Sequence, residues 1–416
     1  MRDADVAVLG AGMVGVSAAL HLQARGRDVV LVDRHGAAGL ETSFGNAGLI
    51  ERASIFPYLF PQDPGKLILY AFNLLPEAHY HISALPSVAP WLWRYYRESA
   101  PGRAARNSAA IRPLIERSLI EHEALIDAAG ARDMLRKTGW IKLYRSRQTL
   151  DAGAAEAEKL RAYGLKIDTL DAAELARREP DLTGGVGGVH YLDPASVDDP
   201  SRVAQVYADL FVSRGGRFLT GDAHGLQEST DGRWSVATHE GPLLARDLVV
   251  AMGPWSDLVY RAFGYDFPMA VKRGYHMHYA PLHDAKLGRP VLDADNGYVL
   301  APMTRGIRLT SGAEFALRDA PATPVQIDRA EPIARKLFPL GERLDAKPWK
   351  GCRPCLPDML PIVGKAPRHQ GLWFDFGHEH HGFTLGPVCG RLLAEMMTGE
   401  TPFTDPKPYG AERFMK

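Results

Sequence analysis

A glycine-rich turn near the amino terminus carries the strongest chemical signal in the sequence. Gly10, Gly12 and Gly15 follow a short apolar run and lead into a longer apolar run of helical character. Without side chains at these positions, a strand can turn tightly into a helix, a phosphate can approach the backbone, and the helix can lie close to the sheet. The helix N-terminus at Met13 and Val14 then offers free N–H groups and a positive dipole end to phosphate oxygens.

An acidic residue completes this pattern. Asp33 ends the second apolar run, 29–32, so the order is strand, glycine turn, helix, strand and acid. A carboxylate in this place can accept hydrogen bonds from an adenosine ribose. A glycine turn alone is a weak signal, but here its whole structural context is present. The pattern predicts a dinucleotide-binding site in a Rossmann-like α/β domain.

The segment that follows indicates which dinucleotide binds. Residues 41–48, with the sequence ETSFGNAG, resemble the amino-acid-oxidising flavoprotein family of D-amino-acid oxidases, glycine oxidase and sarcosine oxidase, and most closely the bacterial D-amino-acid dehydrogenases. The resemblance implies bound FAD and an FAD domain of the glutathione-reductase type with an inserted antiparallel substrate sheet. It implies further FAD contacts at Arg34, Thr42, Ser43, Asn46, Ala47, Gly48, Gly253, Trp255, Gly382, Phe383 and Thr384.

The same resemblance divides the chain into interleaved segments. Residues 1–85, 184–256 and 347–416 are expected to build the FAD-binding domain, and residues 86–183 and 257–346 the substrate-binding domain. The likeness covers nearly the whole chain and is weakest over residues 54–180.

Local patterns predict the elements that position these residues. Helices are expected over 104–129, 150–163, 171–178, 201–214 and 388–397, and strands over 140–144, 234–238, 243–245, 248–252, 271–277, 298–302 and 306–312. Asp199 is the expected N-cap and Pro200 the first residue of the helix over 201–214. Gly382 and Gly386 would let the backbone approach the flavin, whose reduced form a helix N-terminus stabilises.

Arg353 is the principal candidate for substrate binding. Amino-acid oxidation requires the α-carboxylate to be held so that the Cα–H bond points at flavin N5. A guanidinium does this with two parallel hydrogen bonds, whereas a lysine gives only a point charge. Members of the resembled family place an arginine at this Arg-Pro position. Tyr275 and Tyr298, in family-like strands, are expected to cover the substrate, and His380 to line the flavin or substrate pocket.

Two other clusters of reactive residues are expected to play no separate role. The run 378–381, His-Glu-His-His, matches no standard zinc spacing, so no metal site is predicted. Cys352 and Cys355 lack the helix start that a redox dithiol requires. Some sarcosine oxidases tether FAD through a cysteine near this point, but the offset differs here, so noncovalent FAD is expected.

The composition excludes several classes of protein. The 49 Lys and Arg residues balance 49 Asp and Glu residues, which gives no electrostatic case for a nucleic-acid partner. Three cysteines in 416 residues make no disulfide framework and favour a reducing, cytoplasmic setting. We expect no signal peptide, because the first apolar run is the nucleotide-binding strand. We expect no spanning helix, because no apolar run approaches about 18 residues.

Residues 54–101 are unusually rich in aromatic residues and prolines. The simpler interpretation is core beneath the substrate domain, and we favour it because apolar residues are usually buried. The alternative is a peripheral contact with a lipid surface, at the inner face of the plasma membrane. That alternative would suit an enzyme that passes electrons to a quinone.

The resemblance therefore implies FAD-dependent oxidative deamination of a free D-amino acid to a 2-oxo acid and ammonia. Hydride would pass from Cα to flavin N5, and electrons would continue to a quinone or other acceptor. D-Proline or hydroxy-D-proline as substrate, and an oxygen-using oxidase of glycine or sarcosine, are the alternatives. A homo-oligomer or a subunit of a heteromeric dehydrogenase also remains open.

Overall fold

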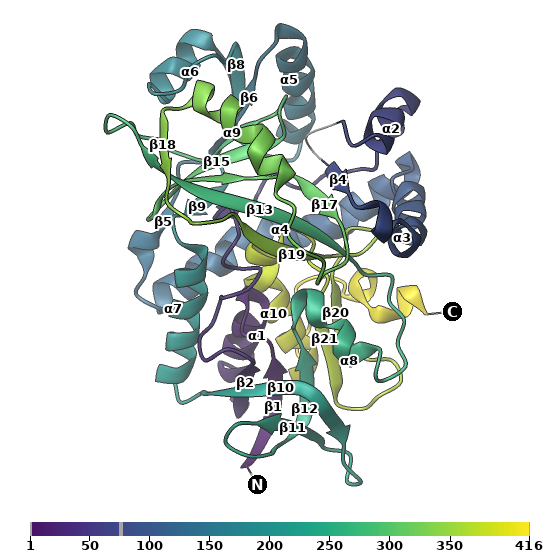
Figure 1. Ribbon diagram of the computed structural model, residues 1–416. Coiled ribbons are helices and arrows are strands. Elements are labelled where there is room, and N and C mark those ends of the chain that lie inside the picture. The colour runs from purple at the N-terminus through teal and green to yellow at the C-terminus, as the bar shows by residue number, and fades with distance from the viewer. Residues whose placement is uncertain (1, 75–77, 416) are drawn as a thin grey trace.

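One large sheet carries the glycine turn. The computed structural model, which describes residues 2–74 and 78–415, gives this sheet a parallel core in the order β10, β2, β1, β12, β21 (Figure 1). β20 pairs antiparallel with β21, and β11 joins β10 and β12. These strands are β1 (Arg2–Leu9), β2 (Val29–Asp33), β10 (Arg217–Glu228), β11 (Trp234–Thr238), β12 (Leu243–Val250), β20 (Ile362–Lys365) and β21 (Leu372–Phe376).

Both faces of this sheet are buried. Along β1, Val6 and Val8 enter one hydrophobic core, whereas Ala7 and Leu9 enter another. A strand that is covered on both sides reads as a continuous apolar run, as the sequence does here. The first core also receives the helices α1 (Met13–Gln23), α4 (Pro101–Ala128), α7 (Pro200–Ser213) and α10 (Gly382–Thr398). Asp199 caps α7 and Pro200 begins it, as expected.

Helices α1 and α10 lie in close contact. A Cβ at Gly386 would lie 2.8 Å from Met13 Cγ, and one at Gly390 would lie 2.7 Å from Ala18 N. Gly386 therefore serves this helix contact, and its expected role in approaching the flavin was wrong. Because α10 begins at Gly382, before the expected start at 388, Pro387 lies inside the helix.

A proline inside a helix leaves a carbonyl without its usual partner. Pro387 has no N–H to donate to the carbonyl of Phe383, four residues earlier. His122 of α4 supplies the donor instead, with its Nε2 2.8 Å from that carbonyl oxygen. This bond explains why the sequence Gly-Pro does not end the helix here.

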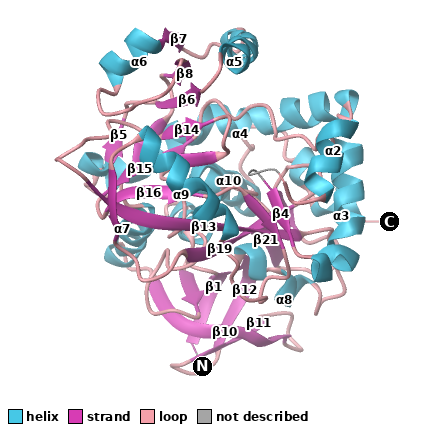
Figure 2. Cartoon of the chain, turned by 45° about the horizontal axis from the view of Figure 1, so that its top comes forward, coloured by secondary structure: helices cyan, strands magenta, loops and turns pink. Residues whose placement is uncertain are grey.

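The second large sheet is built on β13, a strand of 12 residues. Its main path is β4-β17-β13-β16-β15-β14-β6-β8-β7, and β18 and β19 also pair with β13 (Figure 2). The strands are β4 (Ala78–Tyr80), β6 (Trp140–Tyr144), β7 (Ile167–Asp171), β8 (Gly187–Tyr191), β13 (Ala270–Pro281), β14 (Val291–Asp293), β15 (Tyr298–Met303), β16 (Gly306–Thr310), β17 (Ala313–Phe315), β18 (Leu340–Arg343) and β19 (Trp349–Cys355). Helices α5 (Arg147–Arg161), α6 (Ala172–Arg178) and α9 (Val325–Leu337) accompany it.

Sheet membership shifts the domain boundaries expected from the sequence. β4, β8 and β19 lie within the segments assigned to the FAD domain, yet all three hydrogen-bond in the second sheet. Conversely, α4 was assigned to the substrate domain but packs its buried face against α10. Backbone pairing across long sequence separations decides these placements. A small third sheet of β3 (Leu49–Ile50), β5 (Leu135–Arg136) and β9 (Ala195–Val197) lies outside both large sheets, and a short α8 (Asp257–Tyr260) follows β12.

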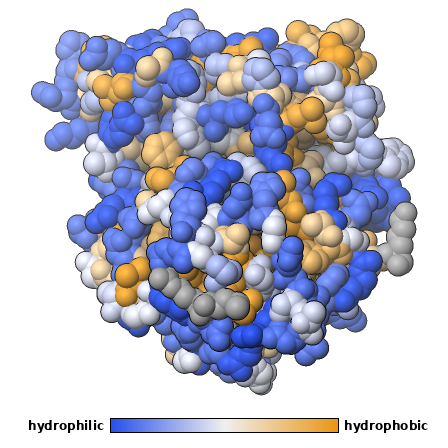
Figure 3. Space-filling model, turned by 60° about the horizontal axis from the view of Figure 1, so that its bottom comes forward, coloured by the Kyte–Doolittle hydropathy of each residue, from blue (hydrophilic) through white to orange (hydrophobic). Residues whose placement is uncertain are grey.

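Residues 64–74 and 78–98 form an exposed apolar cover over one side of the molecule. The cover contains α2 (Pro64–Ala71) and α3 (Leu85–Glu98). The exposed fraction is 59% for Ile68, 72% for Phe72 and 61% for Trp93, so the interpretation of this segment as ordinary core was wrong for these side chains. Figure 3 shows that hydrophobic residues gather unevenly on the face in view, with a concentration at the upper right.

Part of the cover does enter a core. Trp91 and Tyr95 of α3 pack with Cys355 and Met359, and Trp91 Nε1 donates to the Cys355 carbonyl at 3.0 Å. α3 is thereby fixed to the end of β19. In the described part of the chain, no helix has both the length and the apolar character needed to cross a membrane.

Candidate active site

The two large sheets enclose a cavity of about 1880 Å³. A single small-molecule pocket usually has roughly 300–1,000 Å³, so this cavity has room for a dinucleotide together with a small substrate. Most of the predicted cofactor residues line it: Gly10, Gly12, Met13, Val14, Asp33, Arg34, Thr42, Ser43, Asn46, Ala47, Gly253, Trp255, Gly382, Phe383 and Thr384. Gly15 and Gly48 do not line the wall and instead shape the backbone behind it.

The glycine turn is held by direct backbone contact. Gly10 has φ +101°, and a Cβ there would lie 2.6 Å from the Ala251 carbonyl oxygen. A Cβ at Gly15 would lie 1.8 Å from the Gly10 carbonyl oxygen. At Gly12, by contrast, the nearest atom is Ser43 Oγ at 3.5 Å, an ordinary contact distance. Gly12 therefore leaves open space in front of the helix without being required for the fold itself.

The start of α1 and the end of β2 face this space together. α1 has no side-chain cap of its own, and its Met13 N–H donates to Ser43 Oγ at 3.1 Å. Asp33 accepts the N–H groups of Ala11 and His35 at 2.7 and 2.8 Å, one on each carboxylate oxygen. Each oxygen keeps a second lone pair. Asp33 can therefore brace the turn and still accept hydrogen bonds from a ribose.

The loop 41–48 is tied to both sheets. The Arg34 guanidinium lies 4.2 Å from the centre of the Trp255 ring and also pairs with Glu41. Thr42 Oγ1 donates to the Cys352 carbonyl at 2.7 Å. The predicted residues Arg34, Thr42 and Trp255 thus fix the loop at one edge of the cavity.

Two residues that the sequence reasoning missed hold the rest of this loop. The buried Arg308 donates to the carbonyls of Phe44, at 3.0 Å, and Asn46. Burial lowers the pKa of Arg308 to about 10, so the side chain stays a cation at neutral pH. The Trp349 ring covers Gly45, where a Cβ would lie 1.8 Å from the ring. The sequence signal that could have identified Arg308 is a charged residue within the otherwise apolar strand β16.

The N-terminus of α10 points into the cavity from the opposite side. α10 has no side-chain cap, and a Cβ at Gly382 would meet nothing closer than His378 Cβ, at 3.7 Å. The Thr384 hydroxyl donates to the Leu49 carbonyl at 3.2 Å and accepts the Glu51 N–H at 3.1 Å. Thr384 therefore anchors the helix start while Gly382 leaves it open. Two helix N-termini, those of α1 and α10, converge on one cavity.

Arg353 projects from β19 onto the cavity wall. It stands opposite Lys272 of β13, and its guanidinium lies over Gly274, where a Cβ would come within 2.5 Å of Nη2. Its Nη1 donates to the Gly312 carbonyl at 3.2 Å. Among the described residues, no carboxylate lies within ion-pair distance of Arg353. A half-buried guanidinium without an ion-pair partner has N–H donors that can bind a carboxylate.

Lys272 and Glu379 form a charged pair beside Arg353 that the sequence reasoning did not assign. Lys272 Nζ lies 3.8 Å from Glu379 Oε2 and 4.7 and 4.6 Å from the ring centres of Trp91 and Tyr95. Glu379 has φ +58°, a left-handed conformation that is uncommon for residues other than glycine. Its Oε1 accepts the Leu356 N–H. Burial raises the pKa of Glu379 to about 7.

Of the predicted tyrosines and histidine, Tyr275 and His380 line the cavity and Tyr298 does not. Tyr298 does not line the cavity: it is 1% exposed, and its neighbours Gly297 and Val299 take the cavity side, because alternate strand residues face opposite ways. This placement does not support its expected role over the substrate. Tyr275 lines the wall, but its hydroxyl donates to Glu314 at 2.7 Å. His380 lines the wall, and its Nε2 has no hydrogen-bond partner among the described residues.

The cysteines are separate, and two clusters could hold a metal ion. Cys352, Cys355 and Cys389 are free and buried. Cys352 and Cys355 stand three apart on β19, so their side chains leave opposite faces. In the described chain, potential metal-ligating atoms lie within 4.8 Å of one another in the groups Asp375–His378–Cys389 and His79–His81–Glu314.

These features suit a flavin dinucleotide. An uncapped helix start with an open glycine suits a pyrophosphate, and a second uncapped helix start suits an anionic ring system. The sequence agrees: the family model for FAD-dependent oxidoreductases matches residues 5–396, and the chain belongs to this family. FAD is its cofactor.

Individual relatives cover nearly the whole chain. D-amino acid dehydrogenase 2 of Mesorhizobium japonicum is 30% identical over 97% of this chain and 98% of its own length. A D-amino-acid oxidase of Bradyrhizobium diazoefficiens is 28% identical over 99% of both chains. The solved structure of glycine oxidase from Geobacillus kaustophilus has a TM-score of 0.74, with 21% identity and complete coverage of both chains. That structure supports the fold.

We predict that Gly12→Val folds but binds FAD at least tenfold more weakly. The added Cβ meets no protein atom closer than an ordinary contact, and the valine side chain would extend into the space before the α1 N-terminus that a pyrophosphate would occupy. The measurement is FAD affinity by fluorescence titration, with circular dichroism to confirm folding. Gly36→Ala is the matched control, because a Cβ there meets nothing within 4 Å. Stoichiometric FAD in purified Gly12→Val would contradict the assignment.

Proposed function

We propose that this enzyme oxidises a free D-amino acid to the 2-oxo acid and ammonia, using noncovalent FAD, and passes the electrons to a quinone or another acceptor. The observation that carries this proposal is Arg353, a half-buried guanidinium on the cavity wall with one carbonyl partner. An amino-acid carboxylate is the ligand that such a group selects. The relatives named D-amino acid dehydrogenase support the substrate class.

The cofactor would span the cavity between the two helix starts. Gly12, Met13 and Val14 would face the pyrophosphate, and Asp33 the ribose. The loop 41–48, fixed by Arg308 and Trp349, and the α10 start at Gly382 would border the flavin. In this arrangement Arg353 and the Lys272–Glu379 pair remain for the substrate.

The protein's own contribution is orientation and electrostatics. FAD supplies, when bound, the acceptor for the hydride that leaves Cα. Arg353 would fix the carboxylate with two N–H donors, which limits rotation of Cα and sets which face of it is presented. The ring of Tyr95, which lines the cavity beside Lys272, would restrict water near the reacting atoms. The imine product then hydrolyses in water.

Other substrates and another electron acceptor are the alternatives to this proposal. A cyclic amine such as D-proline or hydroxy-D-proline carries the same carboxylate and would use the same Arg353 contact. The relative named D-amino-acid oxidase favours oxygen as acceptor in place of a quinone. A small substrate such as glycine or sarcosine would leave more of the 1880 Å³ cavity to water than a D-amino acid with a side chain.

We predict that Arg353→Ala lowers kcat/KM on the identified substrate about 100-fold, because a lost charge-assisted bidentate contact costs about 3 kcal/mol. FAD should remain bound. Steady-state kinetics and the flavin absorbance test the two parts. Arg353→Lys should recover only part of the loss, since lysine cannot form the two-point contact. Arg261→Ala, an exposed arginine, is the control. Near-normal efficiency in Arg353→Ala would place the carboxylate elsewhere.

We predict slow reaction of the reduced enzyme with oxygen and faster turnover with a quinone or an artificial dye. The basis is the likeness of the sequence to proteins named D-amino acid dehydrogenase. Stopped-flow reoxidation in air-saturated buffer measures the first rate, and dye reduction measures the second. Rapid return of the yellow colour with stoichiometric peroxide would identify an oxidase instead.

We further propose that the apolar cover rests on an anionic lipid surface. Phe72, Ile82 and Trp93 expose 72%, 77% and 61% of their surface, and Arg94 and Arg97 are exposed beside Trp93. Exposed aromatic and aliphatic residues next to arginines are typical of peripheral membrane contacts. A contact there would bring the covered side of the cavity next to a membrane quinone.

Vesicle sedimentation tests this contact. The triple variant Phe72→Ser/Ile82→Ser/Trp93→Ser should bind vesicles of anionic phospholipid at least tenfold more weakly, because each buried apolar side chain contributes about 1.5–3 kcal/mol. Val212→Ser removes a comparably exposed apolar residue from α7 and should have no effect. If the parent protein stays in the supernatant, or the triple variant binds equally well, the cover has another role.

A further inference from the structure

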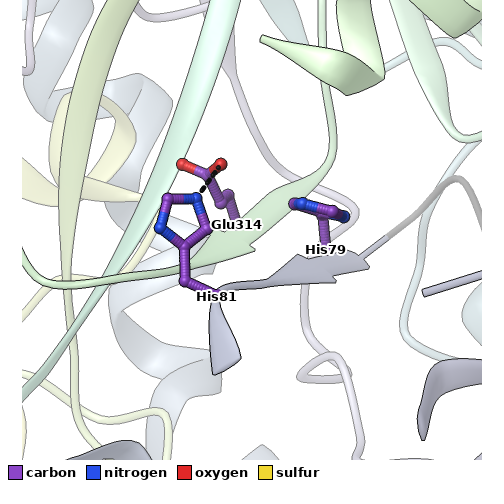
Figure 4. Close-up of side chains that lie close together, drawn as sticks. All are labelled: His79, His81 and Glu314. Carbon is purple, nitrogen blue, oxygen red and sulfur yellow. Dashed lines mark hydrogen bonds and ion pairs between the residues drawn. The ribbon is translucent and has the colours of Figure 1, made fainter. Parts of the chain in front are cut away.

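We propose that His79, His81 and Glu314 form a binding site for one divalent transition-metal ion of the zinc class. The site lies on the cavity wall where β4 meets β17 (Figure 4). One nitrogen from each imidazole and one carboxylate oxygen lie within 4.8 Å of one another. The proposal does not depend on the substrate or the electron acceptor of the enzyme.

The backbone places these three side chains on one face. β4 pairs in parallel with β17, and His79 stands directly opposite Glu314. His79 and His81 are two residues apart, so both side chains leave the same side of β4. Figure 4 shows the two imidazoles from β4 and the carboxylate from β17 around a common space. Two residues from one strand and one from its neighbour are thus brought together by register alone.

The donor atoms and their spacing suit zinc. Imidazole nitrogens and a carboxylate oxygen are standard zinc ligands, and bonds of about 2.0–2.2 Å in a tetrahedron place neighbouring ligand atoms about 3.4 Å apart. The distance from His81 Nε2 to Glu314 Oε1 is 3.1 Å. A modest rotation of the His79 ring would bring its nitrogen to a similar distance from the other two ligand atoms. Water would complete the tetrahedron, since both histidines are only half-buried.

A plain hydrogen bond between His81 and Glu314 explains two of the three residues. It does not explain His79, whose Nδ1 is buried and has no hydrogen-bond partner among the described residues. An unpartnered imidazole nitrogen beside a histidine–carboxylate pair supplies the third ligand of the proposed site.

The surroundings also fix the carboxylate ligand. Glu314 is fully buried, and its other oxygen, Oε2, accepts hydrogen bonds from Arg273 Nε at 2.6 Å and the Tyr275 hydroxyl at 2.7 Å. Outer partners of this kind orient a ligating carboxylate and turn Oε1 toward His81. Thr323 Oγ1 donates to the same Oε1 and lies 2.7 Å from His81 Nε2, so its hydroxyl would have to turn aside when the metal binds. A bound ion would join the apolar cover to the second sheet.

Zinc binding to the full-length FAD-loaded protein tests the proposal. The protein is freed of metal with a chelator, dialysed, and titrated with zinc chloride by isothermal titration calorimetry. One zinc ion per chain should bind in the micromolar range or tighter. X-ray absorption at one equivalent should show two imidazole ligands. His79→Ala and His81→Ala should each weaken binding at least about 100-fold, because the loss of outer partners alone already costs about 10–100-fold.

Matched variants separate this site from other binding. His283→Asn removes an exposed histidine from a left-handed position that asparagine tolerates, and should leave the affinity unchanged. Cys389→Ser should also leave it unchanged, which excludes the second cluster at Asp375 and His378. Glu314→Gln is avoided because it would leave the buried Arg273 without its partner. The proposal is overturned if the parent protein does not bind zinc at micromolar concentrations. It is also overturned if His79→Ala and His81→Ala bind zinc as tightly as the parent protein.

Discussion

The backbone ladder between β13 and β19 is the constraint on which the rest of the site depends. It sets Arg353 opposite Lys272 and lays the guanidinium over Gly274, the one residue that leaves room for it. After β19 the chain runs through β20 and β21 to the N-terminus of α10. One stretch of sequence therefore delivers both Arg353, on the second sheet, and the helix start that belongs to the first sheet. A shift of one residue in this ladder would turn Arg353 away from the cavity.

Local signals were read correctly from the sequence, and long-range ones were not. The glycine turn, Asp33 and the N-cap Asp199 are governed by neighbours within one strand–turn–helix unit, so residue type and spacing suffice to predict them. Tyr298 was misplaced because period-2 alternation identifies a strand without saying which face meets the cavity. Arg308 and Lys272 were missed because their partners lie far along the chain, and nothing local marks a lysine that will lie beside Trp91.

The apolar cover shows a different reason for failure. Composition alone cannot tell a buried apolar segment from an exposed one, because burial depends on what the rest of the chain can place against it. Here the chain supplies Cys355 and Met359 to cover Trp91 and Tyr95, whereas Phe72 and Trp93 stay exposed among the described residues. The predicted helix start at 388 was wrong for a different reason. Pro387 lies inside α10 because His122, distant in sequence, donates a hydrogen bond to the carbonyl of Phe383.

The glycine contact between α1 and α10 has a consequence for how such an enzyme can evolve. At Gly386 and Gly390 the backbone of α10 meets α1 with no side chain of its own between them, so the distance between the two helix starts is set by main-chain thickness. Substitution can only enlarge that distance, never tune it. In the proposed arrangement, this fixed distance sets the span that is available to the cofactor between the two helix starts. New substrate preferences must arise in the side chains of the second sheet and the cover, which are free to vary around that fixed span.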